Sequence, residues 1–122
     1  MTVVAAHVSV AQIGADAFVV SAAGELDLAS QEIFDRELAG AIERGCRRLI
    51  VDLTAVTFMD STALGALLLN VKRLPKNGGC VVVDDDPRIL RVFEITGLDR
   101  TFLIERSLAE GIDRLVGRIA RA

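Results

Sequence analysis

Two short runs of apolar and β-branched residues constrain this chain most, RLIVDL at 48–53 and CVVV at 80–83. Such runs are typical of parallel strands whose two faces are both covered by helices. An amphipathic segment from Leu64 to Leu74 separates them at helical spacing, and Pro75 ends it. A strand, a helix and a second strand of these lengths predict a parallel pair joined by a right-handed crossover.

The rest of the chain extends this alternation. The segments 3–10 and 17–23 read as strands of a hairpin around Gly14, and Asp86 with Pro87 opens a helix that Gly97 stops. The other expected elements are a helix at 28–44, a strand at 101–104, and a final helix after the Ser107–Glu110 capping box, with Ala109, Ile112, Leu115, Val116 and Ile119 on one face. The order ββαβαβαβα predicts an α/β fold, one mixed sheet packed with four helices, in a single domain over residues 1–122.

Composition excludes several kinds of partner. The chain has 122 residues, a net charge of -3, five Phe and no Trp or Tyr, and its pI is about 5.1. Neither the basic surface nor the aromatic platforms that bind nucleic acid are therefore expected. The sequence has no apolar run of 18 residues and no basic stretch followed by an apolar one at its start, so we expect a cytoplasmic protein without a membrane partner.

Catalytic motifs are also missing. The segment GAIERGCR at 40–47 has the two glycines of a phosphate-binding loop, but it lacks the Lys-Ser/Thr ending and precedes a strand. No Gly-x-Ser-x-Gly elbow is present, and His7 is the one histidine. A receiver-like phosphoprotein needs an acidic pair after its first strand, where Val10, Ala11 and Gln12 stand instead. We expect no enzyme activity, no catalytic residues and no cofactor.

The cysteines and an acidic triplet have simple structural readings. Cys46 and Cys80 form no CxxC motif, so a zinc site is not expected. If their strands are parallel neighbours, both thiols lie near one sheet edge and form a candidate redox pair. The triplet Asp84 to Asp86 is read as a cap for the following helix rather than as a metal site.

The junction between the strand at 48–53 and the next helix is the most informative segment. The strand ends at Leu53, a few residues pass over the sheet edge, and the helix begins at or next to Asp60 and Ser61. A hydroxyl at a helix N-terminus lies where unpaired N–H groups tolerate a phosphate. From the residues alone, Asp60 or Ser61 is either a plain N-cap or a phosphorylation site.

The segments VDLTAVTFMDSTALGALL at 51–68, GELD at 24–27 and PRILRVFEITGLDRTF at 87–102 together resemble the STAS domain of bacterial anti-sigma factor antagonists. The likeness covers essentially the whole chain, and the family shares the order ββαβαβαβα. In that family an anti-sigma factor, itself a serine kinase that holds the nucleotide, phosphorylates the serine after the aspartate. The resemblance thus implies Ser61 as acceptor and a PP2C-type phosphatase as the enzyme that resets it.

The chain departs from the commonest family pattern at Thr62 and Ala63, where Ser-Gly is frequent. Thr62 is a second hydroxyl one residue along, and it is the second choice of acceptor. Related domains in transporters and stressosomes are scaffolds, which is the alternative function.

The ends of parallel strands gather at one edge of such a sheet. We therefore expect an acidic rim around Ser61, completed by Asp84 to Asp86, which docks the kinase. The expected partner-binding residues are Glu25, Asp27, Phe58, Met59, Asp60, Thr62, Leu64 and Gly65.

Overall fold

The computed structural model describes residues 6–117 and alternates strands and helices in the expected order. The strands are β1 (His7–Gln12), β2 (Ala17–Leu26), β3 (Arg48–Met59), β4 (Gly79–Val83) and β5 (Leu103–Glu105). The helices are α1 (Gln31–Glu43), α2 (Ser61–Val71), α3 (Pro87–Thr96) and α4 (Leu108–Ile112), with a 3-10 turn at Leu98–Arg100 and a π-helical segment at Asp113–Gly117.

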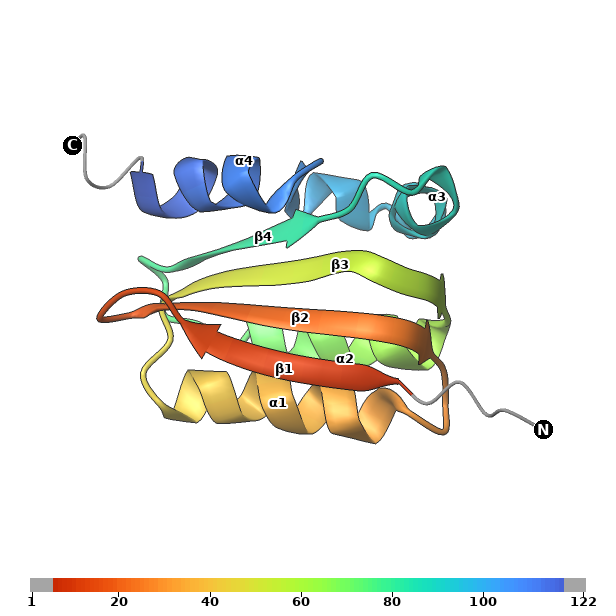
Figure 1. Ribbon diagram of the computed structural model, residues 1–122, viewed down its shortest axis with the longest axis horizontal. Coiled ribbons are helices and arrows are strands. Elements are labelled where there is room, and N and C mark those ends of the chain that lie inside the picture. The colour runs from red at the N-terminus through yellow and green to blue at the C-terminus, as the bar shows by residue number, and fades with distance from the viewer. Residues whose placement is uncertain (1–5, 118–122) are drawn as a thin grey trace.

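The strands form one sheet in the order β1-β2-β3-β4-β5. β1 pairs antiparallel with β2, and the other pairs are parallel. All three parallel connections pass through a helix, as the short apolar strands predict. The α/β class and the mixed sheet with four helices are thereby confirmed (Figure 1).

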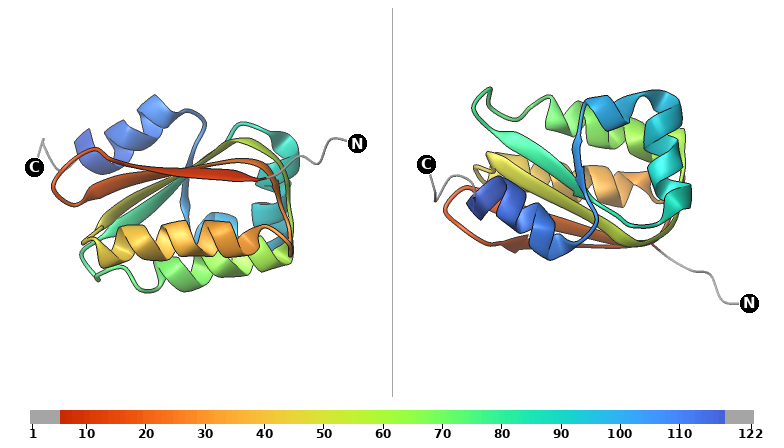
Figure 2. Two further views of the ribbon diagram at one scale, coloured as in Figure 1. Left: turned by 60° about the horizontal axis from the view of Figure 1, so that its bottom comes forward. Right: turned by 90° about the horizontal axis from the view of Figure 1, so that it is seen from above.

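Two apolar clusters cover the two faces of the sheet. On one face, α1, α2 and α3 bury residues such as Phe34, Leu67 and Phe93 against β2, β3 and β4. On the other face, Leu115 and Ile112 pack on a smaller cluster that includes Ile50 and three valines. The helices α1 and α2 thus lie on the side of the sheet away from α4 (Figure 2). None of the helices within residues 6–117 is long and apolar enough to cross a membrane.

The third strand differs from its expected length. It continues past Leu53 to Met59, so the residues predicted to pass over the sheet edge are strand residues. They pair with Ala23 to Leu26 of β2 across two irregularities, at each of which β3 has one extra residue. Such bulges let a strand bend while it stays paired. The pairing partner lies far away in sequence, which is why the local pattern ends the strand too early.

Other boundaries move by a few residues. α1 begins at Gln31 and not at Leu28, because the residues before it form a turn in which Ser30 and Gln31 donate backbone hydrogen bonds to the carbonyl of Asp27. β1 extends to Gln12, and the first three residues of its predicted range lie outside the described residues, as does Ile119. The Ser107 cap of α4 is present, with the N–H of Glu110 donating to the Ser107 hydroxyl at 3.2 Å.

Candidate functional site

Asp60 caps α2 at the point where β3 ends. Its Oδ1 accepts hydrogen bonds from the backbone N–H of Thr62 at 3.0 Å and of Ala63 at 3.2 Å. Its own N–H donates to the carbonyl of Leu26 at 3.0 Å, which ties the helix start to the end of β2. The extended backbone of Asp60 and a side chain that accepts from the second and third helical residues are the marks of an N-cap. The cap reading of the junction therefore holds for Asp60.

Ser61 and Thr62 differ in what their hydroxyls do. The Thr62 hydroxyl donates to Oδ1 of Asp60 at 2.5 Å, and its side chain is partly buried. Ser61 is exposed as the first residue of α2, and no described residue hydrogen-bonds to its hydroxyl. A group at this position faces the positive end of the helix dipole and can accept negative charge. The geometry therefore distinguishes a structural hydroxyl at Thr62 from a free one at Ser61.

The carboxylate of Asp60 is held ionised by its hydrogen bonds. Burial acts to raise its pKa, but the Thr62 hydroxyl and the backbone N–H groups of Ala63, Thr62 and Leu28 together lower the pKa below its usual value. A permanent negative charge thus lies beside the free hydroxyl of Ser61.

Asp27 serves its own loop. Its Oδ1 accepts from the N–H groups of Ala29 and Ser30 at 3.1 Å each and from the Ser30 hydroxyl at 3.0 Å. Of the acidic residues that GELD and the helix start supply, Asp27 and Asp60 are thus engaged in local hydrogen bonds, whereas Glu25 is exposed. Of these three carboxylates, only that of Glu25 accepts no hydrogen bond from the described residues.

The residues beside the site alternate between core and surface. Phe58 is 48% exposed and pairs across the strands with Glu25. Met59 and Leu64 are each only 4% exposed, and both belong to the main core. The strand pleat and the helix face turn both side chains inward, so neither is offered at the surface of the unbound chain. Their contact with a partner stays a prediction.

Gly65 lies one helical turn after Ser61, and a Cβ built on it would meet no atom within 4 Å. The fold itself does not require this glycine, which costs about 0.5–1 kcal/mol in a helix interior relative to alanine. Leu69, a further turn along, is 66% exposed. Ser61, Gly65 and Leu69 thus share one open helix face by their spacing of four residues.

Two exposed leucines were missed by the sequence reasoning. Leu69 falls outside the apolar stripe of its helix, and Leu28, which is 70% exposed, follows directly after GELD. Large apolar residues at positions that the helical pattern assigns to solvent are the signal that could have found them.

The acidic triplet divides into three roles. Asp86 caps α3 by accepting from the N–H of Arg88 at 2.9 Å, as predicted. Asp85 is exposed, but Asp84 is fully buried, so it is not part of a surface rim. Its Oδ1 accepts from the N–H of Asp86 at 2.9 Å, and its Oδ2 has no partner. Burial raises the pKa of Asp84 to about 6.

The cysteines lie at the opposite ends of the strands from Ser61. Cys46 precedes β3, and Cys80 is the second residue of the parallel neighbour β4. Both thiols are free and buried. Burial raises the pKa of Cys46 to about 11 and that of Cys80 further still.

The fold, in which Asp60 caps α2 and Ser61 follows it, has a counterpart among known protein families. The family model described as the STAS domain matches residues 8–111. The chain belongs to the STAS domain family.

Particular relatives carry the name anti-sigma factor antagonist. The anti-sigma-B factor antagonist of Bacillus subtilis (strain 168) is 36% identical over 80 residues, which cover 65% of this chain and 72% of that protein. An anti-sigma factor antagonist from Mycobacterium paratuberculosis has a similar crystal structure, with 27% identity and a TM-score of 0.85 over 91% of this chain and 94% of that one. The Bacillus cell fate determinant SpoIIAA in its phosphorylated form shares the fold, with 23% identity and a TM-score of 0.69 over 88% of this chain and 98% of that one.

Proposed function

We propose that this protein is an anti-sigma factor antagonist and that phosphorylation of Ser61 switches it off. The observation that carries the proposal is the exposed hydroxyl of Ser61 at the start of α2. No described residue hydrogen-bonds to it, although its two neighbours, Asp60 and Thr62, bond to each other. A kinase can reach this oxygen without unfolding the helix. The names of its STAS relatives support the class of function.

The partner in this proposal is an anti-sigma factor that is also a serine kinase and holds the nucleotide. The surface offered to it consists of Glu25, Phe58, Leu28 and the open helix face that runs from Ser61 through Gly65. The exposed carboxylate of Glu25 favours a basic docking site, and the absence of a side chain at Gly65 lets a partner approach the helix backbone closely.

Phosphorylation changes the charge of this surface and leaves its fold intact. A phosphoserine carries about 1.5 to 2 negative charges at neutral pH. The positive end of the α2 dipole favours it, while the ionised Asp60 beside it adds to the local negative charge. A partner that fits the uncharged hydroxyl closely then meets an extra charge to be desolvated, so the complex dissociates. A PP2C-type phosphatase restores the binding form.

The acceptor is tested with the cognate kinase, ATP and three variants. We expect Ser61→Ala to abolish phosphate incorporation, and Thr62→Val to retain it because the Thr62 hydroxyl is bound to Asp60. Ser9→Ala, which removes an exposed serine on β1, is the matched control. Incorporation into Ser61→Ala at the wild-type level would overturn the assignment.

The switch is tested by a pull-down of the anti-sigma factor. Unphosphorylated protein is expected to bind, and phosphorylated protein or Ser61→Asp to bind at least tenfold more weakly, which corresponds to about 1.4 kcal/mol. Equal binding of both forms would refute the switch and favour a scaffold role.

A further inference from the structure

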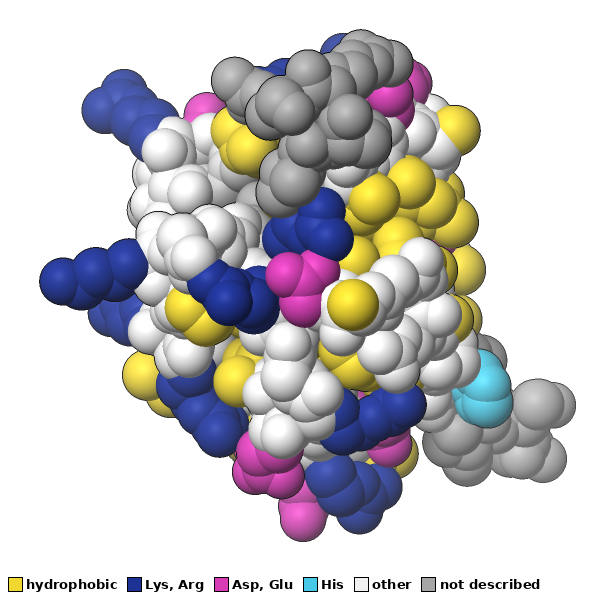
Figure 3. All heavy atoms as spheres, turned by 90° about the vertical axis from the view of Figure 1, so that its left-hand side faces the viewer, with side chains coloured by type: hydrophobic (Ala, Val, Ile, Leu, Met, Phe, Trp, Pro, Cys, Tyr) yellow, Lys and Arg dark blue, Asp and Glu magenta, His cyan; other side chains and the backbone are white. Residues whose placement is uncertain are grey.

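Charge is divided between the two ends of the parallel strands. We define the basic pole as the loops before β2, β3 and β4, together with the last residue of α1 and the first residue of β3. The acidic pole consists of the loops after the same strands, together with the end of β2 and the start of α3. The basic pole carries Arg44, Arg47, Arg48, Lys72, Arg73 and Lys76 against Asp16 and Glu43. The acidic pole carries Glu25, Asp27, Asp60, Asp84, Asp85 and Asp86 against Arg88. Lysine and arginine side chains gather on the face that shows the basic pole (Figure 3).

The basic pole is built on loops that are hydrogen-bonded to one another. The carbonyl of Asp16 accepts from the N–H groups of Arg47 at 2.9 Å and of Arg48 at 3.1 Å. The N–H of Gly79 donates to the carbonyl of Arg47 at 2.9 Å, and a Cβ at Gly78 would lie 2.2 Å from that same oxygen. The three loops are therefore held in a fixed arrangement, so the backbone positions of the cationic residues are fixed relative to one another.

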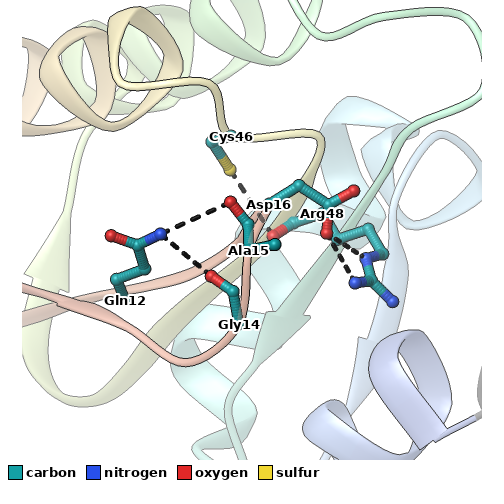
Figure 4. Close-up of polar contacts among 6 residues, drawn as sticks. All are labelled: Gln12, Gly14, Ala15, Asp16, Cys46 and Arg48. Atoms are coloured by element: carbon teal, nitrogen blue, oxygen red, sulfur yellow. Dashed lines mark hydrogen bonds and ion pairs between the residues drawn. The ribbon is translucent and has the colours of Figure 1, made fainter.

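Some cations of this pole are already satisfied within the chain. The guanidinium of Arg48 bonds to the Asp16 carboxylate through both Nε and Nη2 (Figure 4). Arg73 lies 3.8 Å from Glu43, and Arg44 lies over the ring of Phe18 at 5.1 Å. Three further cations have no carboxylate partner among residues 6–117, namely Arg47, Lys72 and Lys76.

The acidic pole has matching unpaired carboxylates. Asp27 and Asp60 bond to their own loops, Asp84 is buried, and Asp86 pairs with Arg88 at 2.8 Å. The exposed carboxylates left over are those of Glu25 and Asp85, for which no cation partner exists among residues 6–117.

We propose that this chain associates head to tail with a second copy of itself, with the basic pole of one copy on the acidic pole of the next. Two complementary surfaces at opposite ends of one sheet suit a heterologous contact, because each copy can use both surfaces at once. A polyanion fits the basic pole less well, since Asp16 and Glu43 interrupt the cations and the chain is negative overall. Both poles are already charged in the unphosphorylated chain, so the contact does not require phosphorylation of Ser61.

The association must be weak and sensitive to salt. Pairs of exposed charges contribute little individually, and ions screen them beyond about 8 Å at physiological ionic strength. We therefore expect the weight-average mass in sedimentation equilibrium to rise with protein concentration at about 20 mM salt and to return toward the monomer mass of 13.1 kDa at about 300 mM salt.

Charge reversal gives a decisive test. Lys72→Glu with Lys76→Glu changes the basic pole from six cations against two carboxylates to four against four. Glu25→Lys with Asp85→Lys changes the acidic pole from six carboxylates against one cation to four against three. Each double variant alone is expected to lose self-association roughly tenfold or more. An equimolar mixture is expected to regain it, because the unchanged acidic pole of the first variant then faces the unchanged basic pole of the second. Arg36→Glu with Arg91→Glu, which gives the same net charge from exposed residues outside the basic pole, is the matched control and should still associate.

Three outcomes overturn the proposal. They are a monomer at every concentration at low salt, a mixture that stays monomeric, and variants that associate as wild type. Binding of the wild-type basic pole to anionic lipid vesicles without self-association would assign the pole to a lipid surface and would also overturn it. Since no kinase is present, none of these results affects the phosphorylation switch.

Discussion

The hydroxyl of Thr62 donates to the carboxylate of Asp60, and Ser61 between them keeps a hydroxyl that no described residue binds. One hydroxyl therefore stabilises the helix start and its neighbour is available for chemistry. The Asp60 carboxylate joins both roles, because it caps α2 and lies beside the oxygen that we propose is phosphorylated.

Loss of the Asp60 cap is expected to destabilise the protein. Asp60→Ala removes the acceptor of two backbone N–H groups and of the Thr62 hydroxyl, so we expect the free energy of unfolding to fall by about 1 kcal/mol. Urea denaturation measures the change. Asp60→Asn keeps a capping oxygen and should lose less. Equal stability of Asp60→Ala and wild type would contradict the capping role.

Two glycines are expected to respond in opposite ways to alanine. Gly65→Ala should raise the free energy of unfolding by about 0.5–1 kcal/mol, because the new methyl group meets nothing within 4 Å. Gly111→Ala should lower it by about 1–3 kcal/mol, because its Cβ would lie 2.6 Å from Cγ2 of Val83. Thermal unfolding of both variants decides the point.

The same substitution at Gly65 tests the proposed docking face. A stabilised Gly65→Ala variant, or a larger Gly65→Leu side chain, should bind the anti-sigma factor more weakly than wild type. Undiminished binding of folded Gly65→Leu would place the partner elsewhere.

Stability is expected to fall as pH rises from about 4 to about 6. The pKa of Asp84 is raised from 3.8 to about 6 by burial. Over this range the folded state holds a proton that the unfolded state has released, so raising the pH favours unfolding. The loss nears its full size only above about pH 7 and is then about 3 kcal/mol, because each pKa unit corresponds to about 1.4 kcal/mol. Urea denaturation at pH 4.5 and pH 7 should show it, and Asp84→Asn should remove this part of the pH dependence. A free energy of unfolding that rises steadily from pH 4.5 to pH 7 in the wild type would show that Asp84 is not the main source of the pH dependence.

The cysteines are expected to be unreactive in the folded protein. Burial raises the pKa of both thiols, so little thiolate exists at neutral pH to attack a disulfide reagent. A thiol count with such a reagent should find two reactive groups in denaturant and close to none without it. Rapid reaction in the native state, or loss of both thiols on mild oxidation, would instead support the redox pair that Cys46 and Cys80 suggest.

Caps and stops could be predicted because they depend on neighbours in sequence. Asp86 and Pro87 open α3, Gly97 ends it in a left-handed conformation, and Ser107 opens α4, all as the residues indicate. These signals act within three or four residues, so distant parts of the chain do not alter them. The candidate site could be found for the same reason, since Asp60 and Ser61 follow a strand and open a helix.

The sequence alone thus determined the order of elements, the single mixed sheet and the position of the serine that follows the cap of α2. Only the tertiary structure decided that β3 continues to Met59, since that depends on pairing with β2. It likewise decided that Met59, Leu64 and Asp84 are buried, and that the hydroxyl of Thr62 is bound while that of Ser61 is free. Burial and hydrogen bonding depend on groups that the fold brings together from distant segments, so they cannot be predicted from the local sequence pattern.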